Sequence, residues 1–494
     1  MKRSYLHISV IALLLMFTME ANIVAAQTLL DDFSGTYLDQ SKWKDIVFVR
    51  EVKGDKLISK IQSSATNTYV RNHTHFKKNI ASINVIQCDI VVSEATLDTG
   101  TDTVSFARIN GFYYNTVGSG NVTGDVWAGV YIGNRGNGLE AFWIVDEVLN
   151  DDMTSSNLLG EGTLIVPGLD YGLTYTVKLE YDGDTTFTFT VAGVSKTIDT
   201  GKTKMGSAIT PFKALTVGAY SNGGSGSGFV SASFDNVQID DPLTAYDDFS
   251  TAPLDQTNWI DKEYIREISG GKLRLNIQAE DERNTARITP INQDTNYLEA
   301  KIIIESGAQI PAGRRGLVRI AGYYYNNSRD GSAGMPYDGE IGDVWVTNRI
   351  VVDDNNQLRA FCSVWASDKP DGWDSNAPNI FYEDFTTAIA FDTAYTLSIE
   401  YTGTALIFKL NNETFQYDIT GIQYPVSTGQ YRTLQSRVYA ENGESGQIKV
   451  QVDDVYVESD PVAPDVPDAP VIEATGNTGG GGGGGGCFIS TTNE

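Results

Sequence analysis

The chain has 494 residues, of which 41% are hydrophobic, and its 36 basic and 63 acidic residues give a formal net charge of −27. This length exceeds what one hydrophobic core usually supports, so more than one domain is expected. The acidic excess argues against nucleic acid or anionic lipid as the main partner, because both require a basic surface, and it favours oxygen-rich loops that hold a cation such as calcium.

Residues 1–26 have the pattern of a secretory signal peptide. Lys2 and Arg3 form the basic end, residues 8–17 form an apolar run too short to span a bilayer, and Val24-Ala25-Ala26 offers small residues for cleavage. No later segment approaches the ~20 apolar residues of a membrane helix. We therefore expect an exported protein, at the cell surface or extracellular, without a transmembrane segment.

The rest of the chain repeats itself after about two hundred residues. Asp31-Asp32-Phe33-Ser34 returns as Asp247-Asp248-Phe249-Ser250, and Gly124-Asp125-Val126-Trp127 returns as Gly342-Asp343-Val344-Trp345. Solenoid units repeat every ~20–50 residues, so this longer period predicts two complete domains. We place them at residues 27–242 and 247–460.

Both repeats have the pattern of short antiparallel strands. Residues 174–181 and 394–401 alternate polar and apolar side chains strictly, and each run is followed by a turn and a second alternating run, as in a hairpin. Helical periodicity is not evident after the signal peptide. The pattern predicts an all-β fold of two tandem antiparallel β-sandwich, or jelly-roll, domains.

One strand in each repeat has an apolar side and a side with an acid and a large aromatic residue. The apolar side is expected to face the core, which leaves an aromatic ring and a carboxylate suited to a sugar ligand. The preceding strand adds an arginine and a tyrosine. The candidate ligand-binding residues are Arg108, Tyr114, Asp125 and Trp127 in the first repeat, and Arg319, Tyr325, Asp343 and Trp345 in the second. The same residues also fit a structural role, in which a loop covers the aromatics and the arginine pairs with the aspartate.

Paired catalytic carboxylates are not evident in either repeat. Glu140 and Asp146 share a strand face but are six residues apart, too far for the ~5–5.5 Å separation of a retaining glycosidase. The second repeat has Arg359 where the first has Glu140. We therefore assign no catalytic residue.

Acids near the ends of each repeat suggest a cation site. Asp32 with Asp235, and Asp248 with Asp453, are candidate calcium ligands, although calcium needs six to eight oxygens and loop carbonyls must supply the others. Surface acids that only solvate the domain ends explain the pattern equally well. Cys88 and Cys362 occupy non-corresponding positions, one in each repeat, and are expected to be buried thiols.

The segment 461–494 differs from both repeats. Prolines recur every third residue from Pro461 to Pro470, and eight glycines, Gly479 to Gly486, lead into Cys487-Phe488-Ile489. Such a segment cannot pack a core, so a disordered Pro/Gly-rich tail is predicted.

Two family resemblances follow from these motifs. The opening Asp-Asp-Phe-Ser pattern with its later tryptophan, and the closing Phe-Asp-Asn-Val strand at 234–237, resemble concanavalin A-like lectin/glucanase domains, the laminin-G-like and family 16 glucanase jelly rolls. This implies a sandwich whose concave face often holds glycans, sometimes with a structural calcium. The tail resembles the glycine-run and Cys-Phe-Ile box of exported bacterial proteins, apart from Ser490, which replaces the usual alanine. That resemblance implies sorting or envelope anchoring through Cys487.

These features together predict an exported cell-surface or secreted protein with two lectin-like domains. Its expected role is glycan binding or adhesion, with a polysaccharide or glycoconjugate as partner. Two copies of a weak site on one chain gain affinity through effective concentration. Two alternatives remain open: a glycoside hydrolase that acts on polysaccharide with a non-standard acid pair, and a structural envelope protein without a ligand.

Overall fold

The computed structural model describes residues 27–64, 69–78, 80–118, 120–222, 225–240, 242–326, 342–366, 379–419, 426–441 and 443–458. The predicted signal peptide and the predicted tail with Cys487 lie outside these ranges. The described residues form an all-β structure of antiparallel sheets. Within them, no helix is long and apolar enough to cross a membrane.

The strands follow the predicted repeat. The first repeat supplies β1 (Gln27–Asp31), β2 (Phe48–Val52), β3 (Leu57–Gln62), β4 (Tyr69–His75), β5 (Val85–Thr96), β6 (Thr101–Asn115), β7 (Asp125–Asn134), β8 (Leu139–Val148), β9 (Ser156–Leu164), β10 (Thr174–Tyr181), β11 (Thr186–Val191), β12 (Val194–Asp199), β13 (Gly206–Ser207), β14 (Lys213–Asn222) and β15 (Phe229–Ile239). The second supplies β16 (Thr244–Asp247), β17 (Tyr264–Ser269), β18 (Lys272–Glu280), β19 (Arg283–Ile288), β20 (Tyr297–Ile304), β21 (Arg315–Asn326), β22 (Asp343–Asp353), β23 (Leu358–Ala366), β24 (Asn379–Asp384), β25 (Ala394–Tyr401), β26 (Ala405–Leu410), β27 (Glu413–Asp418), β28 (Val426–Tyr439), β29 (Ser445–Ile448) and β30 (Val450–Glu458). The predicted hairpins after residues 174 and 394 are confirmed as β10–β11 and β25–β26.

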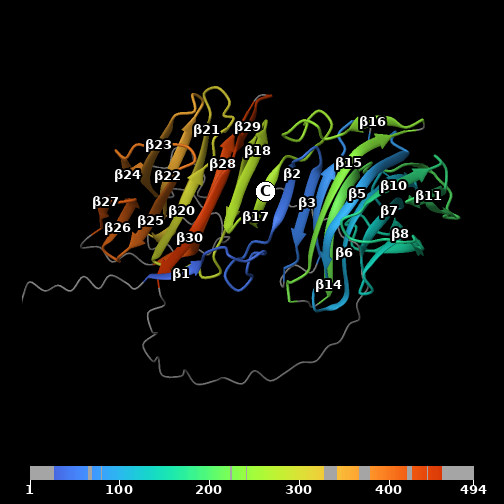
Figure 1. Ribbon diagram of the computed structural model, residues 1–494, viewed down its shortest axis with the longest axis horizontal. Coiled ribbons are helices and arrows are strands. Elements are labelled where there is room, and N and C mark those ends of the chain that lie inside the picture. The colour runs from blue at the N-terminus through green and yellow to red at the C-terminus, as the bar shows by residue number, and fades with distance from the viewer. Residues whose placement is uncertain are drawn as a thin grey trace, which may run out of the picture.

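Each repeat forms a β-sandwich, and the two sandwiches share one of their sheets. A 17-stranded sheet runs through both repeats, a 7-stranded sheet (β4, β14, β6, β7, β8, β9, with β13) covers it in the first, and a 6-stranded sheet (β19, β28, β21, β22, β23, β24) covers it in the second. The shared sheet is continuous because β2 pairs with β17 at the centre of the molecule (Figure 1). Val49 pairs there with Ile265, its equivalent in the other repeat, so the repeats are related by a local two-fold axis.

The opening segments of the two repeats are exchanged. Strand β1 belongs to the first repeat but pairs with β30, the last strand of the second. Strand β16 opens the second repeat but pairs with β15, the last strand of the first. The exchange continues beyond the strands, because Trp43 forms a bridge with Pro290 and Trp259 forms one with Phe76. The folded units therefore differ from the sequence repeats at residues 27–49 and 244–261.

The repeated Asp-Asp-Phe-Ser…Trp motif is the structural basis of this exchange. The Asp31 carboxylate accepts hydrogen bonds from the Phe33 backbone N–H (2.9 Å) and the Trp43 indole N–H (2.7 Å). Asp247 makes the same two bonds, to Phe249 (2.8 Å) and Trp259 (2.6 Å). Both phenylalanines have φ of 51°, which turns the chain sharply, and both rings stack on the tryptophan of the motif. The motif folds a loop that presents two aromatic rings to a core.

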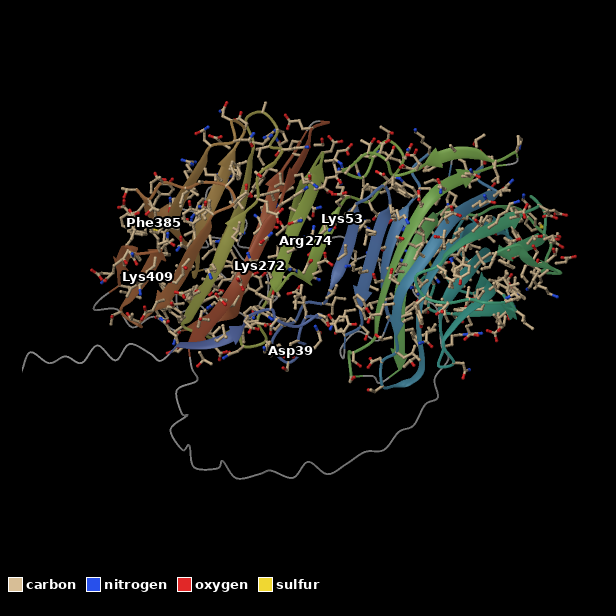
Figure 2. The ribbon with its side chains drawn as sticks, in the orientation of Figure 1. Asp39, Lys53, Lys272, Arg274, Phe385 and Lys409 are labelled. Carbon is tan, nitrogen blue, oxygen red and sulfur yellow. The ribbon has the colours of Figure 1, made fainter. Side chains whose placement is uncertain are left out.

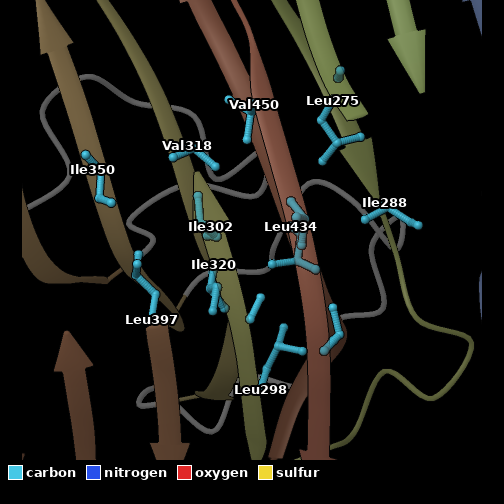
Figure 3. Close-up of a cluster of buried hydrophobic side chains, with 14 of the residues drawn as sticks. Leu275, Ile288, Leu298, Ile302, Val318, Ile320, Ile350, Leu397, Leu434 and Val450 are labelled. Atoms are coloured by element: carbon cyan, nitrogen blue, oxygen red, sulfur yellow. The ribbon is translucent and has the colours of Figure 1, made fainter. Parts of the chain in front are cut away.

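Each core contains the aromatic pair of the opposite repeat. Phe33, Leu38 and Trp43 are fully or almost fully buried among second-repeat side chains such as Leu275, Ile302 and Leu434. Figure 3 shows part of this core between the two sheets. Phe249, Leu254 and Trp259 are buried in the same way in the first-repeat core.

Ion pairs join the repeats beside the β2–β17 contact, and two of them are related by the local two-fold axis. Arg50 pairs with Asp261 (3.1 Å) and Arg266 pairs with Asp45 (3.1 Å). Arg274, labelled in Figure 2, bridges Glu51 of the first repeat (2.5 Å) and Glu267 of the second (2.6 Å). Because most of these groups are largely buried, the junction resembles the interface of a symmetric dimer more than a flexible linker.

The two described cysteines are buried, as predicted. Cys88 and Cys362 are each 0% exposed and form no disulfide. Burial raises the pKa of both thiols, to about 12 for Cys362, so they act as small apolar core residues.

Candidate functional site

The candidate site of the first repeat lies on the outward face of the 7-stranded sheet, the face turned away from the core. Alternation along β7 directs Val126, Val130 and the other even-numbered residues into the core, whereas Trp127 and Tyr131 point outward. Large aromatic side chains from neighbouring strands surround them. This aromatic cluster consists of Phe106, Phe112, Trp127, Tyr131 and Phe142.

Arg108 lies at the centre of the aromatic cluster. Its guanidinium carbon is 4.8 Å from the Trp127 ring centroid, and its Nη1 donates a hydrogen bond to the Tyr131 hydroxyl (2.8 Å). Arg108 is 2% exposed and Trp127 only 7%. The predicted pair of arginine and tryptophan is therefore assembled, but both side chains are covered by their neighbours.

A small hollow opens beside this cluster. Its internal volume is about 30 Å³, roughly the space of one water molecule, and it is lined by Arg71, Arg108, Phe112, Trp127, Asp146 and Phe212, among others. A sugar ring does not fit into a space of this size. Any ligand of the first repeat must lie on the rim or displace side chains.

The equivalent face of the second repeat is more open at its tryptophan. The Trp345 side chain is partly exposed, with the Arg319 guanidinium carbon 5.2 Å from its ring centroid. Tyr323 and Tyr431 flank the indole at centroid distances of 4.8 and 6.1 Å. The predicted Arg319 and Trp345 are thus brought together, and part of the indole reaches solvent.

Tyr114 and Tyr325 do not join these faces, which corrects the expectation. A β-bulge lies between Phe112 and Tyr114, and another between Tyr323 and Tyr325. One extra residue reverses the side to which the following side chain points. Tyr114 and Tyr325 are therefore core residues. The outward tyrosine of the second repeat is Tyr323.

Asp125 and Asp343 are fully buried at the start of their strands. The Asp125 carboxylate accepts hydrogen bonds from the backbone N–H groups of Ile209 (3.0 Å) and Thr210 (3.1 Å) and from the Asn115 side chain (2.9 Å). Asp343 accepts the corresponding bond from Asn326 (3.0 Å). Each residue is 0% exposed, so neither acid presents an oxygen to solvent.

Asp146 is the acidic residue of the hollow. Burial and the nearby Glu161 carboxylate raise the pKa of Asp146 to about 6, although Arg108 opposes the shift. Glu140, the other acid considered on this strand, accepts hydrogen bonds from the Nε and Nη2 of Arg135, each at 2.9 Å. The proximity of Asp146 and Glu161 could not be predicted from the sequence, because it depends on the pairing of β8 with β9 in the folded sheet.

The predicted calcium ligands are separated by the segment exchange. The opening-motif acid near Asp235 is Asp248, not Asp32. Burial is the main cause that raises the pKa of Asp235, and the charges of Asp89 and Asp248 raise it further. Asp32 and Asp248 each accept a backbone hydrogen bond from the serine two residues later. No group of three or more His, Cys, Asp or Glu side chains able to hold a metal gathers within the described ranges. Calcium binding stays a prediction.

Comparison with known proteins gives only structural similarities. No protein-family model matches the chain, and no curated protein sequence matches it either. Among solved structures, it is similar to the alginate lyase Aly36B (14% identity, TM-score 0.23, 40% of this chain and 83% of the lyase). It is also similar to a laminarinase from Flavobacterium sp. UMI-01 (14%, 0.27, 40% and 84%) and to carbohydrate-binding module CBM66 from Bacillus subtilis (12%, 0.20, 37% and 86%).

Proposed function

We propose that this chain binds polysaccharide through the outward faces of its two covering sheets, chiefly the face of the second repeat. The observation that carries this proposal is the partly exposed Trp345 indole, flanked by Tyr323, Tyr431 and the Arg319 guanidinium. Aromatic rings stack on the apolar faces of sugars, and guanidinium groups donate hydrogen bonds to their oxygens. The first repeat has the same elements but covers them.

Two sequence features bear on where the chain would meet its ligand. The secretory pattern of residues 1–26 and the Cys487 box support export, with the tail as an envelope tether and adhesion as the role. A polysaccharide at the cell surface is then the partner that an exported chain with a net charge of −27 encounters.

Replacing Trp345 with alanine tests the proposal. We expect the Trp345→Ala variant to lose about 2 kcal/mol of binding free energy, roughly thirtyfold in Kd, because the indole is the exposed aromatic anchor of the face. Affinity gel electrophoresis against a panel of neutral and acidic polysaccharides, with calcium and with chelator, measures the loss. Ile165→Ala, which removes a side chain that is 86% exposed in the first repeat, is the matched control. Equal retention of both variants, with unchanged melting temperatures, would exclude this face.

Glycoside hydrolysis is a second candidate, supported by Asp146 alone. A carboxylic acid with a pKa of about 6 beside a second carboxylate is suited to act as a general acid. We expect Asp146→Asn to abolish any release of reducing ends, and the wild-type rate to fall above about pH 6, where Asp146 loses its proton. The second repeat has Trp365 at this position in the sheet, so its face lacks this acid. Absence of reducing ends from the wild-type protein across the panel contradicts this candidate.

A further inference from the structure

Arginines gather on the outward face of the 6-stranded sheet, here called the arginine face. Arg319 of β21 pairs directly with Arg349 of β22. Two residues along these strands, Leu317 pairs with Val351. Arg437 of β28 flanks Leu317, and Arg359 of β23 flanks Val351. Arg315 lies two residues before Leu317 on the same face of β21. The arginine face is therefore formed by Arg315, Arg319, Arg349, Arg359 and Arg437.

The arginine face combines buried and exposed guanidinium groups. Arg319 is 5% exposed and Arg349 is 7% exposed, whereas Arg315 and Arg359 are exposed at the rim. Within the described part of the chain, none of these four arginines forms an ion pair with a carboxylate. Their partners are neutral: Arg319 donates to the Gln435 amide oxygen (2.7 Å) and Arg349 to the Ser363 hydroxyl (3.0 Å).

The buried pair of Arg319 and Arg349 is electrostatically unfavourable without an anion. Like charges directly opposite each other on neighbouring strands destabilise a sheet, and burying a guanidinium removes its hydration. The Nε of Arg349 is buried and has no hydrogen-bond partner among the described residues. Burial raises the pKa of Tyr439, but Arg437, Arg319 and Arg315 outweigh it and lower this pKa to about 8, a sign of strong positive potential.

At most of these positions the first repeat has no arginine. The sheet positions of Arg349, Arg437 and Arg359 are occupied there by Tyr131, Gly218 and Glu140. Arg108 is the equivalent of Arg319. Arg108 donates a hydrogen bond to the Tyr131 hydroxyl, whereas Arg319 lies opposite a second arginine, Arg349. The two faces have therefore diverged in charge while keeping the same fold. In a chain with a net charge of −27, a local arginine cluster is a specific feature of one face.

We propose that the arginine face binds an acidic polysaccharide, one that carries carboxylate or sulfate groups, and that the two repeats therefore differ in ligand. This inference rests on the proposed function, and it adds the ligand class and the repeat that selects it. Guanidinium groups are weakly hydrated and match carboxylate and sulfate oxygens with two parallel hydrogen bonds. Trp345, stacked against Arg319, supplies the adjoining surface for a sugar ring.

The test uses the full chain and the double variant Arg315→Gln/Arg359→Gln. Both side chains are exposed, so their replacement should leave the fold unchanged, which the melting temperature checks. The control is Lys53→Gln/Lys196→Gln, which removes the same charge from exposed positions of the first repeat. The probes are polygalacturonate, dextran sulfate, neutral dextran and a single-stranded DNA oligonucleotide, compared by affinity electrophoresis at two salt concentrations.

We expect polygalacturonate, dextran sulfate or both to bind the wild type and the lysine control. The arginine variant should bind about tenfold more weakly, with a smaller salt dependence. Preference between the two acidic probes identifies carboxylate or sulfate as the recognised group. Binding of neutral dextran alone, unaffected by the arginine variant, would overturn this inference and leave the proposed function intact. Equal binding of DNA and the acidic polysaccharides would overturn the sugar assignment. Failure of every polysaccharide to bind would overturn both proposals.

Discussion

Replacing Trp43 with alanine is expected to destabilise the core of the second repeat, although Trp43 belongs to the first repeat in sequence. The side chain is 0% exposed and packs among second-repeat residues. Removing a fully buried tryptophan costs about 3–5 kcal/mol, and the indole hydrogen bond to Asp31 is lost as well. Hydrogen–deuterium exchange should accelerate in β18 and β20 and change little in β5 and β10.

Trp259→Ala is the matched control, because the same substitution is made at the equivalent position. Its effect should appear in β5 and β10 of the first repeat, since Trp259 packs in that core. The exchange of opening segments would be contradicted if each variant accelerated exchange in its own repeat.

The second large effect is expected from the ion pair between Arg50 and Asp261. Asp261→Asn should destabilise the chain by about 2–4 kcal/mol, because it leaves a largely buried guanidinium without its carboxylate. Asp261 also accepts bonds from the backbone N–H (2.6 Å) and the ring Nδ1 (2.7 Å) of His75, so the loss includes more than one contact. Urea denaturation of wild type and variant measures the difference.

The pH dependence of this effect has a defined sign. Burial alone raises the pKa of Asp261, but Arg50 and the bonds from His75 outweigh it and hold this pKa well below its usual range. The stabilisation is therefore complete above the unfolded-state pKa of about 4, and it is lost as the pH falls through the lower folded-state value. The difference between wild type and Asp261→Asn should begin to shrink near pH 5, about one unit above the unfolded-state pKa, should be clearly smaller at pH 3, and should keep shrinking toward the folded-state pKa. Asp55→Asn, the same substitution at an exposed position, is the control. A difference that stays constant over this pH range would assign the loss to packing instead of charge.

Local patterns in the sequence predicted the strands and the apolar sides of the sheets. Alternation at 174–181 and 394–401 matches β10 and β25 to the residue, because one buried side of a strand requires period two. The same reasoning placed Trp127 and Trp345 on the outward side correctly. It placed Tyr114 and Tyr325 on the wrong side of the sheet. A β-bulge adds one residue just before each of them, and the pattern of polar and apolar residues does not reveal the bulge.

Features that depend on non-local pairing could not be predicted. The motif of Asp31 and Trp43 is recognisable in the sequence as a repeat, but nothing in it says which of two similar cores receives the rings. The arginine face was missed for a related reason. Its members come from strands β21, β22, β23 and β28, and only the register of those strands shows that they share one face.

The exchanged opening segments have a consequence for the order in which the chain can be completed. As the polypeptide emerges from its N-terminal end, the first sandwich gains its last rings, at Phe249 and Trp259, only after the second repeat has begun. The core that buries Phe33 and Trp43 is not complete until β30 has been synthesised, because β1 pairs with that final strand. The aromatic residues of the first opening segment therefore reach their final core only after the last strand has been synthesised, and each sandwich needs a segment of the other repeat to complete its core.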